Sequence, residues 1–339
     1  MMNALVYYKA TKEMKIVNIP MLKATPEHVI VKMAASNLLP VDAMVKYGAE
    51  VPMAYKSFPD FDCLGFEGSG IVEEIGEGVP PEIKGKKVAF SRMNIGNDFF
   101  GSFSQYSRVN YKHLMILEDY MNLEECSGLF INPLTALDLI DQAKQLGAKA
   151  AIATAGASSL AKILGKVGPK LGLEIISIVR KKEDVLNLNK IGIKHALNSS
   201  DPSFDADLKK IVGELKATVA FDAVCGDIKS KLADALLPGS TIIVYGALGG
   251  DITKLNPVNL IFKGINLKGS ALGTKPLCFD EKIYAEYIKI ILEDMKSTKN
   301  FKTEVVTRFT LDKFNEAYDF FPKVASIGKV ILTPNYKPE

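Results

Sequence analysis

The sequence has no tryptophan, and in 339 residues it has only three histidines and four cysteines. The histidines lie far apart in the chain, and no two cysteines have the CxxC spacing of a structural zinc site. Scattered cysteines are typical of a protein that keeps its thiols reduced. The sequence therefore argues against a disulfide framework and a zinc lobe. The residues concerned are His28, His113, His195, Cys63, Cys126, Cys225 and Cys278.

Long apolar runs and excess charge are also missing. No apolar run reaches the roughly 18 residues that suggest a membrane span, and the N-terminal residues alternate like a strand rather than a signal peptide. The net charge is only +3, from 42 Lys and Arg against 39 Asp and Glu. Such a balance favours neither nucleic acid nor an anionic membrane as an obligatory partner. We expect a cytoplasmic protein that acts on a small molecule.

The most informative stretch that is present runs from residue 148 to residue 182. It has a short apolar run at 150–153, a cluster of small residues, apolar residues at helical spacing between 160 and 171, and a second apolar run at 173–179. Strand, turn, helix and strand within about 30 residues form the mononucleotide-binding unit of a Rossmann sheet. Such a unit binds pyrophosphate with the backbone N–H groups at the start of its helix.

The glycine fingerprint of this unit is incomplete. No literal G-x-G-x-x-G occurs, and small residues stand where glycines are usual. Small side chains still let the backbone approach a phosphate, although only glycine adopts a positive φ without steric cost. The turn is consistent with nucleotide binding and also with a purely structural βαβ unit. If it binds the pyrophosphate, the residues that do so are Gly156, Ala157, Ser158, Ser159 and Leu160.

The remaining pattern divides the chain into three segments. Residues 1–122 are rich in short alternating runs, residues 123–272 alternate helix and strand, and residues 273–339 contain a helix at 282–295 and strands near 303–310 and 329–333. Within the first segment, residues 52–63 are rich in Pro, Phe and Asp, and we expect a loop there. We expect an α/β fold in which a doubly wound parallel sheet is inserted into a split β-rich domain. The six strands expected in the inserted sheet are 150–154, 175–179, 195–197, 219–223, 241–245 and 265–268.

Several segments fall in the order of a known family. They read PVDAMVKYG, GFEGSGIVEEIGEGV, KGKKVAF, NPLTA, IVRKKEDV, AFDAVCG, LPGSTIIVYGALGG and SIGKVIL. Together they resemble the zinc-independent medium-chain dehydrogenases/reductases, in particular the quinone oxidoreductases and the trans-2-enoyl-thioester reductases. The resemblance implies a GroES-like catalytic domain split around a Rossmann NADP-binding domain. It also implies an NADPH-dependent enzyme that transfers a hydride to a quinone or an activated C=C bond.

The same resemblance implies that no metal is bound and that the protein forms a dimer. Zinc-bearing relatives have a Cys just before the first catalytic-domain helix and a His in a Gly-His-Glu motif. Leu39-Pro40 and Phe66 occupy these places here. The strand expected around residues 265–270 would pair with a second copy, so a homodimer is expected.

The resemblance also assigns cofactor-binding residues. Arg180, at the tip of the second strand of the Rossmann unit, would hold the adenosine 2′-phosphate, where NAD-selective domains carry an acidic residue. The alternative is a solvated basic helix start. Thr135 would lie near the nicotinamide, or would simply cap a helix. Residues at the ends of later strands would line the groove, or form ordinary turns: Cys225, Gly226, Tyr245, Gly246, Ala247, Leu248, Ala271, Leu272 and Gly273.

The proton donor is where this sequence departs from the family. Related reductases carry Asn three residues before the helix Asp and Tyr eight residues after it. Counted from Asp42, these positions hold Leu39 and Glu50. Asn37, Tyr47 and Tyr55 are nearby polar residues, of which Asn37 and Tyr47 are the catalytic candidates, with water as the alternative donor. Because a hydroquinone oxyanion can take its proton from water, the departure favours a quinone or a small enone as substrate.

Two other functions remain open from the sequence. One is a metal-free reductase of aldehydes or ketones. The other is a non-catalytic NADPH-binding protein, whose nucleic-acid-binding version the small net charge disfavours.

Overall fold

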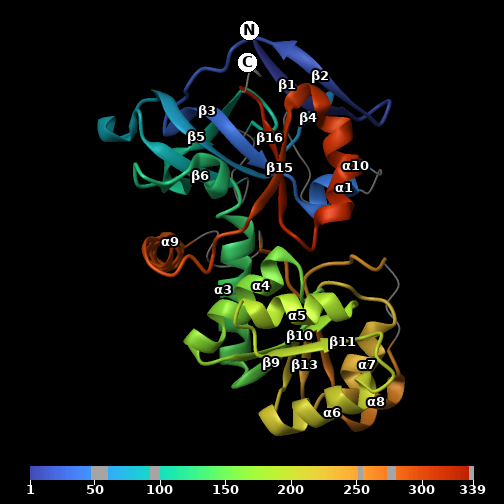
Figure 1. Ribbon diagram of the computed structural model, residues 1–339. Helices are drawn as coiled ribbons and strands as arrows, with labels where there is room; N and C mark the ends of the chain where they lie inside the picture. The colour runs from blue at the N-terminus through green and yellow to red at the C-terminus, as the bar shows by residue number, and fades with distance from the viewer. Residues whose placement is uncertain (47–59, 92–99, 251–254, 273–279, 336–339) are drawn as a thin grey trace. The chain divides into compact units, whose positions relative to one another are not determined.

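The structure is a computed structural model, which describes residues 1–46, 60–91, 100–250, 255–272 and 280–335. It divides into two compact units (Figure 1). The first unit comprises Met1–Ile131 and Leu277–Glu339, and the second comprises Asn132–Pro276. No helix among the described residues has both the length and the apolar character needed to cross a membrane.

The first unit contains two sheets. The smaller sheet is antiparallel, with strand order β2-β1-β4, and the larger has order β15-β16-β3-β5-β6-β8, with β7 also paired to β3. Figure 1 shows the C-terminal strands, in red, beside β3, in blue. The strands are β1 (Met2–Tyr8), β2 (Glu13–Ile19), β3 (His28–Asn37), β4 (Phe61–Cys63), β5 (Glu67–Ile75), β6 (Lys87–Ser91), β7 (Tyr106–Asn110), β8 (Met115–Ile116), β15 (Val305–Thr310) and β16 (Lys329–Thr333).

Alternating apolar residues give this unit its core. Val29, Val31 and Met33 of β3 pack with Val72 of β5 and Phe90 of β6. In a second cluster, one face of α10 (Phe314–Val324) packs against the larger sheet and against β1. The helix has an apolar face because its apolar residues recur every three or four positions. The helices of the unit are α1 (Pro40–Lys46), α2 (Leu123–Cys126), α9 (Glu281–Lys296) and α10 (Phe314–Val324).

One sequence interpretation in this unit is wrong. The segment 52–63 reads as a loop, but Phe61–Cys63 is strand β4, whose Cys63 pairs with Val6 of β1. The side chain of Cys63 is buried in an apolar cluster with Val6, and this burial stabilises pairing for such a short strand. Residues 52–59 lie outside the described residues.

The second unit is a doubly wound parallel sheet with strand order β11-β10-β9-β12-β13-β14. All six expected strands are confirmed, with ends that differ by one residue or less. They are β9 (Ala150–Ala153), β10 (Glu174–Val179), β11 (His195–Asn198), β12 (Val219–Asp222), β13 (Thr241–Val244) and β14 (Asn266–Gly269). The strand order reverses direction at β9 and β12, and ligands bind open α/β sheets at such a switch point.

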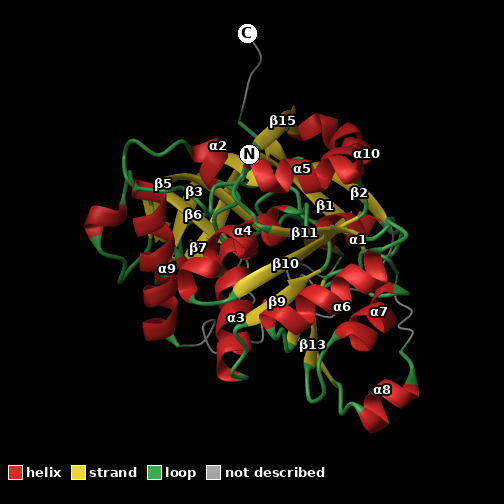
Figure 2. Cartoon of the chain, turned by 60° about the horizontal axis from the view of Figure 1, so that its bottom comes forward, coloured by secondary structure: helices red, strands yellow, loops and turns green. Residues whose placement is uncertain are grey.

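Helices cover both faces of this sheet (Figure 2). In both views α4 and α5 lie on one side, and α6 and α7 lie on the other. Phe204 and Leu208 of α6 and Leu232 of α7 pack with the strands in the main core cluster. The helices are α3 (Ile131–Gln145), α4 (Ser159–Val167), α5 (Lys182–Lys190), α6 (Phe204–Leu215), α7 (Ile228–Ala235) and α8 (Pro257–Phe262).

Candidate coenzyme-binding site

The turn between β9 and α4 brings the chain very close to the neighbouring strand. The Gly156 N–H donates a hydrogen bond to the Ile178 carbonyl of β10 at 2.8 Å. A Cβ built on Gly156 would lie 2.9 Å from the Ser177 Cβ and 3.0 Å from the Ile178 oxygen. A glycine is therefore required here by the close approach. The preceding residue, Ala155, adopts the positive φ of 50° that fingerprint glycines often supply.

The start of α4 leaves donors for an anion. The Ser158 side chain caps the helix by accepting from the Ala161 N–H at 3.3 Å. The N–H groups of Ser159 and Leu160 have no partner in the helix itself, as at every helix start. Together with the helix dipole they favour a negatively charged group at this turn. The close-packed glycine and the unpaired amides fit the pyrophosphate of a dinucleotide.

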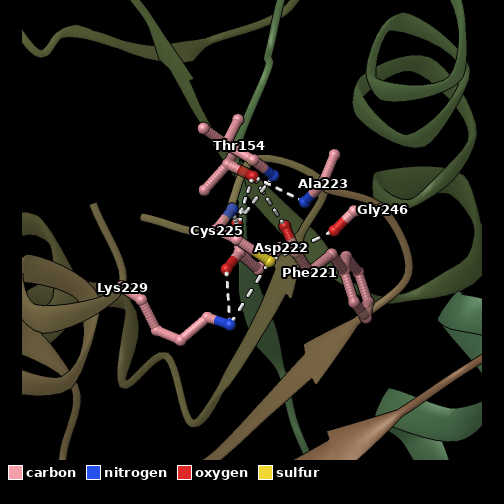
Figure 3. A network of polar contacts seen from close by, with 8 residues as sticks. Thr154, Phe221, Asp222, Ala223, Cys225, Lys229 and Gly246 are labelled. Carbon is pink, nitrogen blue, oxygen red and sulfur yellow. Dashed lines mark hydrogen bonds and ion pairs between the residues drawn. The ribbon is translucent and has the colours of Figure 1, made fainter. Parts of the chain in front are cut away.

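An aspartate joins this turn to the end of the next strand in the sheet (Figure 3). The Asp222 Oδ1 accepts hydrogen bonds from Thr154 Oγ1 at 3.0 Å, from the Val224 N–H at 2.9 Å and from the Cys225 N–H at 3.1 Å. The Thr154 Oγ1 in turn accepts from the Ala223 N–H at 2.8 Å. This network fixes the ends of β9 and β12 relative to each other. The sequence interpretation missed both Thr154 and Asp222, whose contact spans 68 positions.

The loop after β13 docks on the loop after β12. The Leu248 N–H donates to the Ala223 carbonyl at 2.9 Å, and the Cys225 Sγ donates to the Gly246 carbonyl at 3.3 Å. Cys225 has a positive φ of 65°, a strained conformation for a residue with a side chain. The structure thus brings together Cys225, Gly226, Tyr245, Gly246, Ala247 and Leu248, as the strand ends predict. Ala271 and Leu272 follow β14, and Gly273 lies outside the described residues.

Tyr245 carries a buried hydroxyl next to this loop. Within the part of the chain that the structure describes, this hydroxyl has no hydrogen-bond partner. Burial, and secondly the negative charge of Asp222, raise the pKa of Tyr245, so the hydroxyl stays protonated. A buried unpaired hydroxyl is a candidate donor to a bound ligand.

Arg180 stands at the tip of β10. It follows the last strand residue, Val179, and its side chain is exposed. The Arg180 carbonyl accepts from the Ser200 Oγ at 3.0 Å, which fixes the backbone at the tip. The nearest acidic residues in sequence, Glu183 and Asp184, lie in the first turn of α5.

Thr135 lies four residues into α3 and is half-buried. The alternative that it caps this helix is therefore wrong, because α3 begins at Ile131. Its role near the nicotinamide stays a prediction.

The catalytic candidate Asn37 belongs to a buried polar cluster of the first unit. It is fully buried, and its Nδ2 donates to Glu67 Oε1. The Glu67 Oε2 accepts from the Ile131 N–H at 2.7 Å. Burial raises the pKa of Glu67, and it lowers the pKa of Lys329, whose charge opposes the effect on Glu67. Asn37 thus has a structural partner, and its catalytic role stays a prediction. Tyr47 lies outside the described residues.

Nothing in the described residues gathers three His, Cys, Asp or Glu side chains into a group that could hold a metal ion. Leu39 is buried beside α1, and its N–H donates to Asp42 Oδ2 at 2.9 Å. Phe66 packs against the core of the first unit.

Two family models match the chain. The alcohol dehydrogenase GroES-like domain matches residues 25–119, and the zinc-binding dehydrogenase domain matches residues 163–293. A 2-haloacrylate reductase from a Burkholderia species is 23% identical over 278 residues, which cover 80% of each sequence. The first match lies within the segment for which the sequence predicts the GroES-like domain, and the second begins inside the predicted Rossmann segment 123–272 and continues past its end.

Solved structures have the same fold. A protein from Mesorhizobium loti, assigned provisionally as an NADPH:quinone reductase, superimposes with a TM-score of 0.82 at 26% identity, and 98% of both chains is covered. The Escherichia coli quinone oxidoreductase solved with NADPH also gives 0.82, at 20% identity, and covers 98% of this chain and 100% of that one. The predicted fold class, a Rossmann domain inserted in a split GroES-like domain, is confirmed. The chain carries an alcohol dehydrogenase GroES-like domain and a zinc-binding dehydrogenase domain, the pair of domains that its resemblance to the medium-chain dehydrogenases/reductases implies.

Proposed function

We propose that this chain is an NADPH-dependent oxidoreductase that transfers a hydride to a quinone or to a C=C bond activated by a carbonyl or carboxyl group. The observation that carries the proposal is the turn at the switch point of the sheet, where Gly156 packs on β10 and where, among the described residues, no acceptor pairs with the first amides of α4. The names of the relatives support it, since one is a 2-haloacrylate reductase and another a quinone oxidoreductase solved with NADPH.

The residues of this chain bind and orient the coenzyme. The amides of Ser159 and Leu160 hold the pyrophosphate, and the exposed Arg180 guanidinium holds the 2′-phosphate. Bound NADPH supplies the hydride. Water supplies the proton, because Leu39 and Glu50 replace the family's donor positions. Leu39-Pro40 and Phe66 occupy the places of zinc ligands, so the reaction needs no metal and a chelator leaves the rate unchanged.

Coenzyme titration tests this proposal. Wild type binds NADPH more tightly than NADH, and Arg180→Ala weakens NADPH binding by about 10- to 150-fold, the range for one charge-assisted contact. Binding of NADH stays the same, because it lacks the 2′-phosphate. Lys190→Ala, which removes an exposed cation at the other end of α5, is the matched control. Equal affinity of the wild type for the two coenzymes would contradict the proposal. Oxidation of NADPH with a panel of quinones, enones and aldehydes then identifies the substrate class.

We also propose that the protein is a homodimer through the β14 edge of the second unit. All four residues of β14 are exposed, and within the described ranges the strand pairs with β13 alone. The neighbouring α8 exposes Ile261 and Phe262, at 72% and 79% of their surface. An open strand edge beside exposed apolar side chains is the surface that a second copy would cover.

A further inference from the structure

Lys229 is a charged residue that the interior of the second unit encloses. It lies in the first turn of α7, and only 1% of its surface is exposed. Its Nζ is 3.6 Å from the Asp222 Oδ2 and 3.4 Å from the Cys225 Sγ, to which it donates (Figure 3). A lysine is almost never buried unless it is paired. The features of the coenzyme site described above do not explain why a lysine should stand here.

Asp222 is the partner whose charge needs compensation. Its side chain is fully buried, and its Oδ1 accepts from Thr154, Val224 and Cys225. Its Oδ2 accepts no hydrogen bond from the described residues and faces the Lys229 Nζ. A buried carboxylate without a cation is strongly unfavourable.

The other titratable groups that face Asp222 are the Tyr245 hydroxyl and the Cys225 thiol, and neither can carry a positive charge. Among the described residues Lys229 is the cation that pairs with this carboxylate.

The Asp222–Lys229 pair is connected by hydrogen bonds to the segments that follow β9, β12 and β13. Through Asp222 it holds Thr154 at the end of β9, where the pyrophosphate turn begins. It holds the Cys225 N–H, and so the strained positive φ of that residue after β12. The loop after β13 rests on the same segment, since the Gly249 N–H donates to the Val224 carbonyl at 2.8 Å.

We propose that Lys229 is a positioning residue for coenzyme binding. Its ammonium group keeps Asp222 in place as an ionised acceptor, and Asp222 holds Thr154 and the loop at Val224 and Cys225 in the conformation that receives the coenzyme. This inference rests on the proposed function. Removing Lys229 alone leaves a buried charge on Asp222 without a partner, whereas replacing both members of a buried ion pair by uncharged residues is often neutral.

The test is a double-mutant cycle read by NADPH affinity, measured by fluorescence titration, and by hydrogen exchange of the Val224 and Cys225 amides. Lys229→Met leaves Asp222 unpaired, weakens NADPH binding by about tenfold or more and speeds exchange of both amides. The double variant Asp222→Asn/Lys229→Met keeps an acceptor oxygen without a charge, and it binds NADPH within about threefold of wild type. Lys231→Met, which removes the partner of Asp205 from the surface of the same helix, is the control and changes neither readout.

Three results would overturn the inference. Lys229→Met could bind NADPH as tightly as wild type, it could leave exchange of the Val224 and Cys225 amides unchanged, or the double variant could bind NADPH no more tightly than Lys229→Met. If Lys229→Met does not fold, Asp222→Asn and the double variant decide. The double variant then binds NADPH at least as tightly as Asp222→Asn, and weaker binding overturns the inference. A wild type that does not bind NADPH refutes the proposed function itself, which is a separate outcome.

Discussion

The β9–α4 turn lies very close to β10. Replacing a glycine by alanine therefore raises or lowers the free energy of unfolding according to whether that glycine lies in this turn. In Gly156→Ala the new Cβ would lie 2.9 Å from the Ser177 Cβ, 3.0 Å from the Ile178 oxygen and 3.1 Å from the Ile178 nitrogen. Two of these atoms belong to the backbone of a central strand, so the turn must move. Overpacking of this kind costs about 1–3 kcal/mol, and a weakened Gly156–Ile178 hydrogen bond costs about 1 kcal/mol more.

The matched control is Gly213→Ala in α6. Nothing lies within 4 Å of a Cβ built there, and the residue is exposed in a helix interior. Alanine at such a position stabilises by about 0.5–1 kcal/mol, because glycine loses more backbone entropy on folding. The two substitutions therefore shift the free energy of unfolding in opposite directions.

Denaturant unfolding monitored by a probe in the second unit measures both variants, and NADPH titration follows the turn itself. Gly156→Ala is less stable than wild type and binds NADPH more weakly, whereas Gly213→Ala is more stable and binds normally. If Gly156→Ala were as stable as wild type, the turn would not be tightly packed on β10. If it were destabilised but bound NADPH normally, the turn would not be part of the coenzyme site.

Three further predictions concern single side chains. Burial raises the pKa of Cys126 to about 12, so iodoacetamide at pH 8 leaves Cys126 unmodified until the protein unfolds, and rapid alkylation in the native protein would contradict this. The neutral thiol also contributes to the free energy of unfolding, and this contribution declines as the pH rises from about 8.5, the value in the unfolded chain, toward the folded-state pKa. Tyr245→Phe removes a buried hydroxyl without a partner among the described residues, so we expect the apo protein to be at least as stable as wild type and NADPH binding to weaken. A lower melting temperature of the apo variant would show that the hydroxyl makes a structural hydrogen bond instead. Phe262→Glu makes the protein a monomer in sedimentation velocity, whereas Leu186→Glu, at an exposed leucine of α5, leaves the dimer intact; a monomeric wild type would rule out the dimer.

The sheet of the second unit could be predicted because its strands are short apolar runs separated by helical patterns. The predicted site residues near the switch point followed from the same rule, since parallel strands end at one edge of the sheet. Arg180 could be placed at the tip of β10 because the apolar run ends at Val179.

Contacts between distant positions could not be predicted. No local signal joins Thr154 to Asp222 or makes Lys229 a buried residue, because burial of a lysine depends on a partner that the folded sheet supplies. The positive φ of Ala155 could not be predicted either, because only a glycine in the sequence indicates a residue with positive φ.

Helix α10 was missed for a different reason. Its apolar residues Phe314, Ala317, Tyr318 and Phe321 recur at helical spacing, but Pro322 near its end resembles a helix breaker. The segment β4 was missed because three residues are too few to show alternation.

The pairing of β16 with β3 has a consequence for biosynthesis. Ile331 and Leu332 pair with Asn37 and Ser36, so β3 acquires this neighbour only after the whole second unit has been translated. The second unit is one continuous segment, which has left the ribosome in full before β16 is made. During this interval only the end of β3 at Ser36 and Asn37 lacks its neighbour, because β7 already covers the other end of that edge, and this end is open to association with other nascent chains. Chaperones that shield nascent β-strands would therefore matter more for the first unit than for the second.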